Sequence, residues 1–290
     1  MAVVVESTSN TAWSTGSSTL TLTKPSGTVD GDFLIAIVAG ADASGGTPTV
    51  SAVPSGWTQE EFVQNTSAAD VTLYAYSKVA SSEGASWNWT VGTSSDYNAG
   101  GVYRISGAST VDVTNNGTAN NNQNPSYATG VTPQANSLLI IGMAATDVTT
   151  AATTVASYAV ATSNPTWTES FDLYNGNSPD MSLASAYATR AESTSTGAWS
   201  LSFSAGSVQD SASFILSIPV DLDVTTNLDT VGIATFSQGG SHDVNLDNEI
   251  ALDTAGILTI SGDQITPTAQ EYEEWTDQSK SSSNWTNQSK

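Results

Sequence analysis

The sequence contains no cysteine and very few basic residues. Among 290 residues there are 6 Lys and Arg against 28 Asp and Glu, which gives a formal net charge of −22. Without cysteine no disulfide can form, so stability must come from packing, subunit association or bound ions. A chain so poor in cations cannot neutralise a phosphate backbone. Nucleic acid is therefore excluded as a partner, and the negative charge is suited to keeping a many-copy surface protein soluble.

Long apolar runs are also missing. The longest strongly apolar run, residues 33–39, is far shorter than the roughly 20 residues that span a bilayer as a helix. Residues 1–6 lack the basic region of a secretory signal. We therefore predict no membrane insertion, and a protein made in a host cytoplasm without a signal peptide and then carried in an extracellular particle.

Residues for nucleophilic or metal chemistry are scarce. The one histidine, His242, lies in an acidic glycine-rich turn, and there is no cysteine to pair with it. The acidic groups Asp30/Asp32, Asp221/Asp223 and Asp243/Asp247/Glu249 lack the spacing of a recognised calcium loop, so we interpret them as solvated turns. We predict no catalytic residue, no cofactor and no metal site. A glycosidase, which needs only two carboxylates, stays open as a third alternative.

Ser, Thr, Asn, Gly and Ala dominate the rest of the chain, and they are arranged as short β-strands. Residues 19–23, 87–91 and 199–203 alternate apolar and polar side chains, which places one face of each strand inward. Turn residues such as those at 25–27 and 44–46 separate the strands. The pattern predicts an all-β fold.

An internal duplication organises the first 220 residues. Residues 32–42 match 137–147, 54–58 match 164–168, and 99–105 match 212–218, always in the same order. The offset grows only from about 105 to about 113 residues, as insertions in loops would produce. We predict a duplicated β-sandwich over 1–220, with repeat one at about 15–110 and repeat two at about 125–220.

Two architectures fit this duplication. One is a single jelly-roll-like sandwich, and the other is two immunoglobulin-like lobes of about 100 residues each. The Asn-rich stretch 115–124 would be a linker in the second case or a surface loop in the first. We prefer one compact unit, because each repeat has a single strongly apolar strand and looks too thin to bury a core alone.

The carboxyl-terminal region differs in composition from the first 220 residues. Residues 221–269 contain two short strand candidates, 232–236 and 256–260, which we interpret as a short β extension that adds to a neighbour. Residues 270–290 carry a ten-residue repeat with Trp275 and Trp285 at equivalent positions. A polar tail with regularly placed indoles predicts a docking segment in which each Trp anchors an interface, with packing on the chain's own surface as the alternative.

Most other tryptophans occupy matched strand positions and are expected in the core. Trp89 has no Trp counterpart in the second repeat, and Trp13 precedes the first. These two residues are therefore the candidates for stacking on a host-surface glycan.

Three motifs carry a resemblance: Lys24-Pro-Ser-Gly-x-x-Asp-Gly-Asp-Phe-Leu34, Pro54-Ser-Gly-Trp-Thr58 and Tyr76-Ser-Lys-Val-Ala80. Over residues 10–220 the chain resembles a poorly characterised family of β-rich proteins from phage and environmental genomes. Residues 231–237 and the tail repeat resemble segments of phage tail and fibre proteins. The resemblance implies a virion component and carries over no catalytic residue.

These observations predict a non-enzymatic virion structural protein of a tailed phage, of the capsid-decoration, head-fibre or tail-fibre type. It would assemble as a homo-oligomer in contact with other virion proteins. The alternative is a carbohydrate-binding adhesin or receptor-binding module.

Overall fold

The computed structural model describes residues 2–42, 46–67, 70–93, 96–120, 122, 124–147, 155–175, 180–203, 208–221, 234–237 and 258–261. Within these ranges the protein is all-β, as predicted, and contains no helix. The chain divides into two units, residues 1–225 and 226–290.

The first unit contains two sets of strands. The first set is β1 (Val4–Ser14), β2 (Thr19–Thr23), β3 (Phe33–Ala41), β4 (Val50–Ala52), β5 (Thr58–Asn65), β6 (Val71–Val79), β7 (Ser86–Val91) and β8 (Tyr97–Ser106). The second set is β9 (Val113–Asn120), β10 (Ser126–Tyr127), β11 (Ser137–Asp147), β12 (Val155–Val160), β13 (Thr168–Asn175), β14 (Asp180–Arg190), β15 (Trp199–Phe203) and β16 (Val208–Ile218).

The strand order repeats between the two sets. The first set forms a large sheet, β1-β8-β3-β6-β5, and a small sheet, β2-β7-β4. The second set forms β13-β14-β11-β16-β9 and β10-β15-β12, the same order with every strand number raised by eight. Apart from the fifth strand, which stays in the large sheet beside the sixth, successive strands alternate between sheets as in a jelly roll. Each half is therefore a jelly-roll-like sandwich.

The strand register also repeats. In the first half Phe33 pairs with Ile105 on β8, and in the second half Leu138 pairs with Ile218 on β16. These partners are the residues that the sequence duplication matched to each other. The repeats begin one strand earlier than the sequence predicted, because β1 and β9 belong to them.

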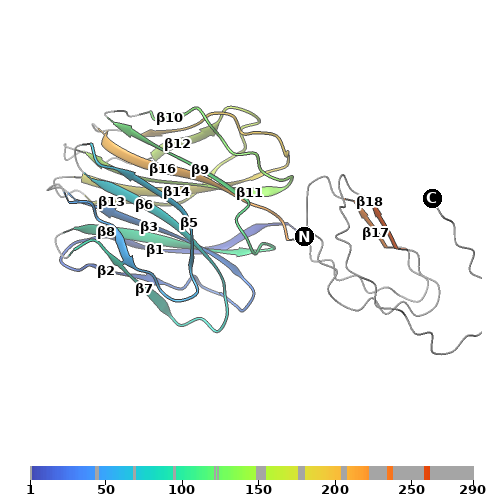
Figure 1. The fold of residues 1–290 in the computed structure, drawn as a ribbon, viewed down its shortest axis with the longest axis horizontal. Coiled ribbons are helices and arrows are strands. Elements are labelled where there is room, and N and C mark those ends of the chain that lie inside the picture. Colours follow the sequence, from blue (N-terminus) through green and yellow to red (C-terminus); the bar gives the residue numbers. More distant parts are fainter. Residues whose placement is uncertain are drawn as a thin grey trace, which may run out of the picture. The chain divides into compact units, whose positions relative to one another are not determined.

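The four sheets of the first unit stack in layers, with the two large sheets in the middle and the small sheets outside (Figure 1). Strand β3 is buried along its whole length. The largest apolar cluster lies between the large sheets, and a separate cluster fills each sandwich. Each half is thus a sandwich with an apolar interior of its own, as in the two-lobe alternative, and the two halves also share the central core, as in the single compact unit. Each repeat looked too thin to bury a core alone because part of its apolar surface is buried against the other repeat.

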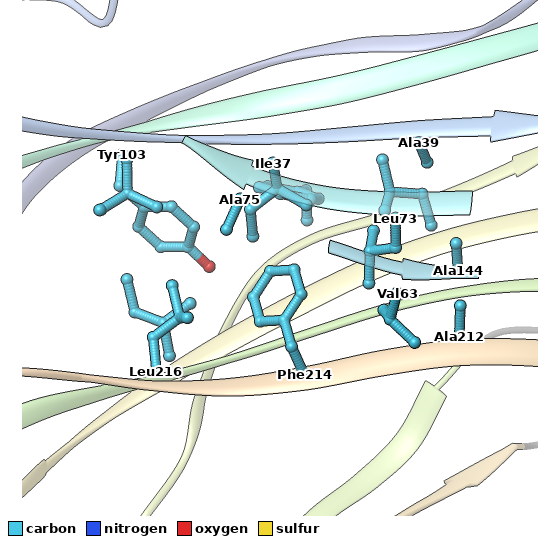
Figure 2. Close-up of a cluster of buried hydrophobic side chains, with 14 of the residues drawn as sticks. Ile37, Ala39, Val63, Leu73, Ala75, Tyr103, Ala144, Ala212, Phe214 and Leu216 are labelled. Atoms are coloured by element: carbon cyan, nitrogen blue, oxygen red, sulfur yellow. The ribbon is translucent and has the colours of Figure 1, made fainter. Parts of the chain in front are cut away.

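The two halves face each other about an approximate two-fold axis that runs along the strands. Strand β1 packs beside β13, and β5 packs beside β9, which is the equivalent pairing with the halves exchanged. Figure 2 shows the large sheets facing each other across the central core, with Ala39 on the same side of the view as its equivalent, Ala144. Equivalent strand ends therefore lie at the same end of the unit.

Part of the Asn-rich stretch belongs to a strand, where the sequence suggested a linker or a surface loop. Its first part forms β9, which pairs with β16 from Val113↔Ser217 to Asn120↔Asp210. Asparagine has a low strand propensity, but here β16 supplies the backbone partners and the amide side chains find acceptors and donors. Asn116 Nδ2 donates to Glu61 Oε1 of the other half at 2.8 Å, and Asn115 Oδ1 accepts from Trp199 Nε1 at 3.3 Å.

The second unit contains a parallel pair of strands, β17 (Ala234–Ser237) and β18 (Leu258–Ser261). They overlap the two strand candidates of the sequence but begin two residues later in each case.

Candidate functional site

Both tryptophans predicted to stack on a glycan are inside the first unit, so that prediction is wrong for this structure. Trp89 has 0% of its surface exposed and packs within the first sandwich. Trp13 is 8% exposed, lies in the central core, and donates from Nε1 to Leu173 O of the other half at 3.1 Å. Trp13 belongs to β1, a strand of the repeat, and this is why it occupies a core position.

The other predicted docking residues, Trp275 and Trp285, lie outside the described residues, as do His242, Asp223, Asp243, Asp247 and Glu249. Of the remaining acidic residues, Asp30 Oδ1 accepts a hydrogen bond from Ser82 N at 2.6 Å. Asp221 Oδ1 accepts from Ser109 Oγ at 2.8 Å. These carboxylates fix turns. In the described ranges no group of three or more His, Cys, Asp or Glu is arranged to hold a metal ion.

The chemistry-bearing residues that do come together are the cations. The first unit contains four Lys and Arg, at positions 24, 78, 104 and 190. Lys78 and Arg104 both pair in register with Leu34, near the start of β3, and Arg190 pairs with Ser137 at the start of β11. Because equivalent ends coincide, all four cations lie at one end of the unit, which we call the cationic end.

Glu83 is the centre of the cationic end in the first half. Lys78 Nζ lies 2.7 Å from Glu83 Oε1, and Trp87 Nε1 donates to Oε2 at 2.9 Å. Lys24 Nζ donates to Glu83 O at 3.2 Å. Only 5% of the Glu83 side chain is exposed. Burial alone would raise the pKa of this carboxyl, but the hydrogen bonds from Lys78, Ser81 and Trp87 lower the pKa below its ordinary value.

A second ion pair lies beside this cluster. Arg104 Nε contacts Asp32 Oδ2 at 2.7 Å, and Val29 N donates to the same oxygen at 2.7 Å. Asp32 thereby closes the turn that enters β3 and holds Arg104 against it. The three sequence motifs at 24–34, 54–58 and 76–80 meet here, since Lys78 Nζ also donates to Ser55 O at 3.4 Å.

In the second half, one arginine without a carboxylate partner holds the equivalent loops in place. Arg190 is 1% exposed, and its guanidinium donates to the carbonyls of Thr162 at 2.6 Å, Ser163 at 3.2 Å and Thr194 at 3.2 Å. It also reaches Ser195 O at 3.4 Å. Two loops are thus joined by one planar donor group.

At the cationic end, ion pairs and hydrogen bonds from the basic side chains hold the loops in place, and we call each such set of contacts a clamp. The lowered pKa of Glu83 is opposite in direction to what a general acid requires, and both of its oxygens already accept hydrogen bonds. Sequence reasoning assigned no role to these cations. Their scarcity could have identified them, because in the first unit each of the four basic residues has a specific partner.

The aromatic residues of the first sandwich form a connected series of rings. Trp57 contacts Trp87 and Trp89 edge-on, with centroids 5.2 and 5.3 Å apart. The series continues through Tyr76 and Tyr74 to Phe62, whose ring stacks on Tyr74 at 4.6 Å and is 36% exposed. Phe62 is therefore the point where this interior series reaches the surface.

Comparison with models of protein families, with curated proteins and with solved structures finds no match to this chain.

Proposed function

We propose that this chain is a non-enzymatic structural subunit of an extracellular assembly, a virus particle of the tailed-phage type, present in multiple copies. The observation that carries the proposal is the way the two jelly rolls are fused. Their large sheets share one apolar core, and the small sheets are left as the outer layers. Jelly rolls of this kind recur as building blocks of capsids, although a fold alone does not assign a function.

The surface chemistry supports the same proposal. On β2 the exposed positions are Thr19, Thr21 and Thr23, while Leu20 and Leu22 point inward. Each of the four cations of the first unit donates to internal partners, so the many carboxylates of the chain have few basic neighbours. A hydroxyl-covered, negatively charged exterior keeps subunits soluble before assembly and repels nucleic acid.

The test is incorporation of the tagged full chain into particles. Particles released from producing cells are separated by density-gradient centrifugation, and the chain is located by immunogold electron microscopy. We expect regular labelling of particles. Recovery of the chain only as free protein, with unlabelled particles, would overturn the proposal.

The tail repeat supplies a sharper version of this test. If Trp275 and Trp285 are interface anchors, W275A/W285A lowers incorporation at least tenfold, as loss of two buried indoles at an interface does. The matched control is T276A/T286A, which changes the neighbouring repeat positions and leaves both indoles in place. Equal incorporation of the two variants would remove the docking role of the tail.

A carbohydrate-binding module is the second candidate, and the exposed ring of Phe62 is the observation that favours it. An aromatic face at the surface can stack on a sugar ring. Under this alternative, a glycan array shows binding by the full chain that Phe62→Ala abolishes and Val53→Ala, a change at another exposed apolar residue, leaves intact. An array without signal above background eliminates the candidate.

A further inference from the structure

The second unit contains a sequence repeat that the first unit does not share. Residues 228–237 read Leu-Asp-Thr-Val-Gly-Ile-Ala-Thr-Phe-Ser, and residues 252–261 read Leu-Asp-Thr-Ala-Gly-Ile-Leu-Thr-Ile-Ser. Seven of the ten positions are identical, at a separation of 24 residues. A repeat of this length with a short strand in each copy is typical of arrays built by stacking one strand on the next.

The strand pairing follows the repeat residue by residue. β17 and β18 are parallel, and each residue pairs with its own repeat equivalent: Ala234↔Leu258, Thr235↔Thr259, Phe236↔Ile260 and Ser237↔Ser261. The pairs are therefore also separated by 24 residues. The sequence repeat and the backbone register give the same translation from one strand to the next.

Two short strands are too few to be stable alone. An isolated two-stranded pair is marginal in water, and repeat arrays need about three or more units to bury a core. In the sheet that β17 and β18 form, the described residues supply no third strand. Among the described residues, each strand has one edge paired with the other strand and a second edge that no strand covers.

We propose that these edges are completed by other copies of this chain, with β18 of one copy pairing in parallel with β17 of the next. In a parallel sheet one edge of each strand pairs with the opposite edge of its neighbour. A strand that is repeated by translation can therefore pair with a further copy of the same repeat. When β17 of a second copy pairs with β18, it meets the same Thr-x-Ser pattern that it meets on β18 of its own chain. The contact is head-to-tail, and it closes into a ring of copies or continues as a stack.

This inference rests on the proposed function, because it names the contact by which copies of the structural subunit join. It also fixes which residues of two chains become neighbours. Thr259 of one copy faces Thr235 of the next, and a copy's Thr235 does not face another Thr235.

The absence of cysteine in the natural sequence makes this contact directly testable in the full chain. Two single variants, T235C and T259C, carry different affinity tags and are co-expressed, and the assembled protein is exposed to a mild oxidant. Neighbouring strands lie about 4.8 Å apart, which is within the Cα separation that a disulfide bridges. Disulfide-linked dimers containing both tags are counted on non-reducing gels. The off-register control replaces T259C by S261C, two residues along the strand.

We expect mixed-tag dimers from T235C with T259C, several-fold more than from the off-register pair, and only background from either variant expressed alone. Efficient crosslinking of T235C to itself would overturn the inference, because it requires a symmetric contact. Absence of mixed dimers, with the same variants still incorporated into particles, would overturn the inference and leave the proposed function standing. Absence of both would overturn the two together.

Discussion

The two halves of the first unit have the same strand order but fill their interiors with different residues. In the first half, Ile37 on β3 lies beside Gly101 on β8, whereas in the second half the equivalent pair is Gly142 beside Phe214. The large and small residues have exchanged strands. A Cβ added at Gly142 would overlap the ring of Phe214, its neighbour on β16, whereas a Cβ added at Gly101 would overlap the ring of Phe171 from the other half.

The same exchange occurs inside the sandwiches. The first half places Tyr74 and Tyr76 on β6, and the second half has Ala184 and Ala186 at those positions. The second sandwich instead takes Tyr158 from β12 of its small sheet, where it joins the same buried cluster. Volume and pattern are thus maintained by compensating changes, and the topology is preserved even though few core residues are identical.

The largest expected effect compares equivalent core residues, Trp89 and Leu201. Both are at most 2% exposed, and both face the interior of their sandwich. Trp89→Ala should lower the free energy of unfolding by about 4 kcal/mol, and Leu201→Ala by about 3 kcal/mol, because the indole leaves the larger cavity. Urea unfolding followed by tryptophan fluorescence and by circular dichroism measures both. A Trp89→Ala variant as stable as wild type would contradict the buried ring series.

The clamps at the cationic end provide the next comparison. Arg190→Met removes a guanidinium that is 1% exposed and that donates to four loop carbonyls, and it should cost about 3 kcal/mol because hydrogen bonds from a charged donor are among the stronger ones. Arg104→Met removes an ion pair whose arginine side chain is 19% exposed, and should cost about 1 kcal/mol. Thermal unfolding of the two variants under one buffer gives the ranking. If Arg104→Met lowered the stability more than Arg190→Met, the clamp formed by Arg190 would be the weaker of the two.

A third prediction concerns the interface between the halves. A Cβ at Gly101 would lie 2.5 Å from Cε1 of Phe171, a ring that is 4% exposed and belongs to the other half. Gly101→Ala should therefore cost about 2 kcal/mol. Combining it with Phe171→Leu, which frees space, should cost less than the sum of the two single changes. Additive costs in this double-mutant cycle would mean that the two residues are not in contact.

The smallest effect is a pH dependence at Glu83. Its pKa is lowered on folding, so the ionised carboxylate stabilises the protein above its unfolded pKa, and this contribution is lost as the pH falls through the folded pKa. Glu83→Gln should cost about 1 kcal/mol at neutral pH, and the difference from wild type should shrink in the acidic range. Chemical unfolding at several pH values measures this difference. A constant difference across the acidic range would argue against the ion pair with Lys78.

Particular residues show how far the sequence could predict this fold. The apolar runs at 33–41 and 138–145 identified the central strands, because short continuous apolar runs bounded by turn residues are typical of strands buried on both faces. The matched order of motifs gave the duplication and even the strand register. Local pattern alone could not show that the halves pack face to face, since that depends on sheets formed by residues far apart in sequence.

Phe62 and Phe171 show why the site was harder to predict. Their motifs appear equivalent, but Phe62 pairs with Tyr74, and Phe171 pairs with Ser185, the counterpart of Ala75. They are therefore one residue out of step, and successive residues of a strand point to opposite faces. Phe62 consequently reaches the surface, and Phe171 enters the central core. The clamps formed by Lys78, Arg104 and Arg190 likewise require loop partners that no spacing in the sequence reveals.

The claim on which the rest depends is that the two jelly rolls form one cooperative unit through their shared core. Hydrogen–deuterium exchange of the full chain, read by mass spectrometry, tests this most directly by comparing β3 of the first half with β11 of the second. We predict that both strands exchange slowest in the chain and with the same free energy of opening, because neither half can unfold without exposing the central core. Exchange of one strand while the other stays protected would contradict the account.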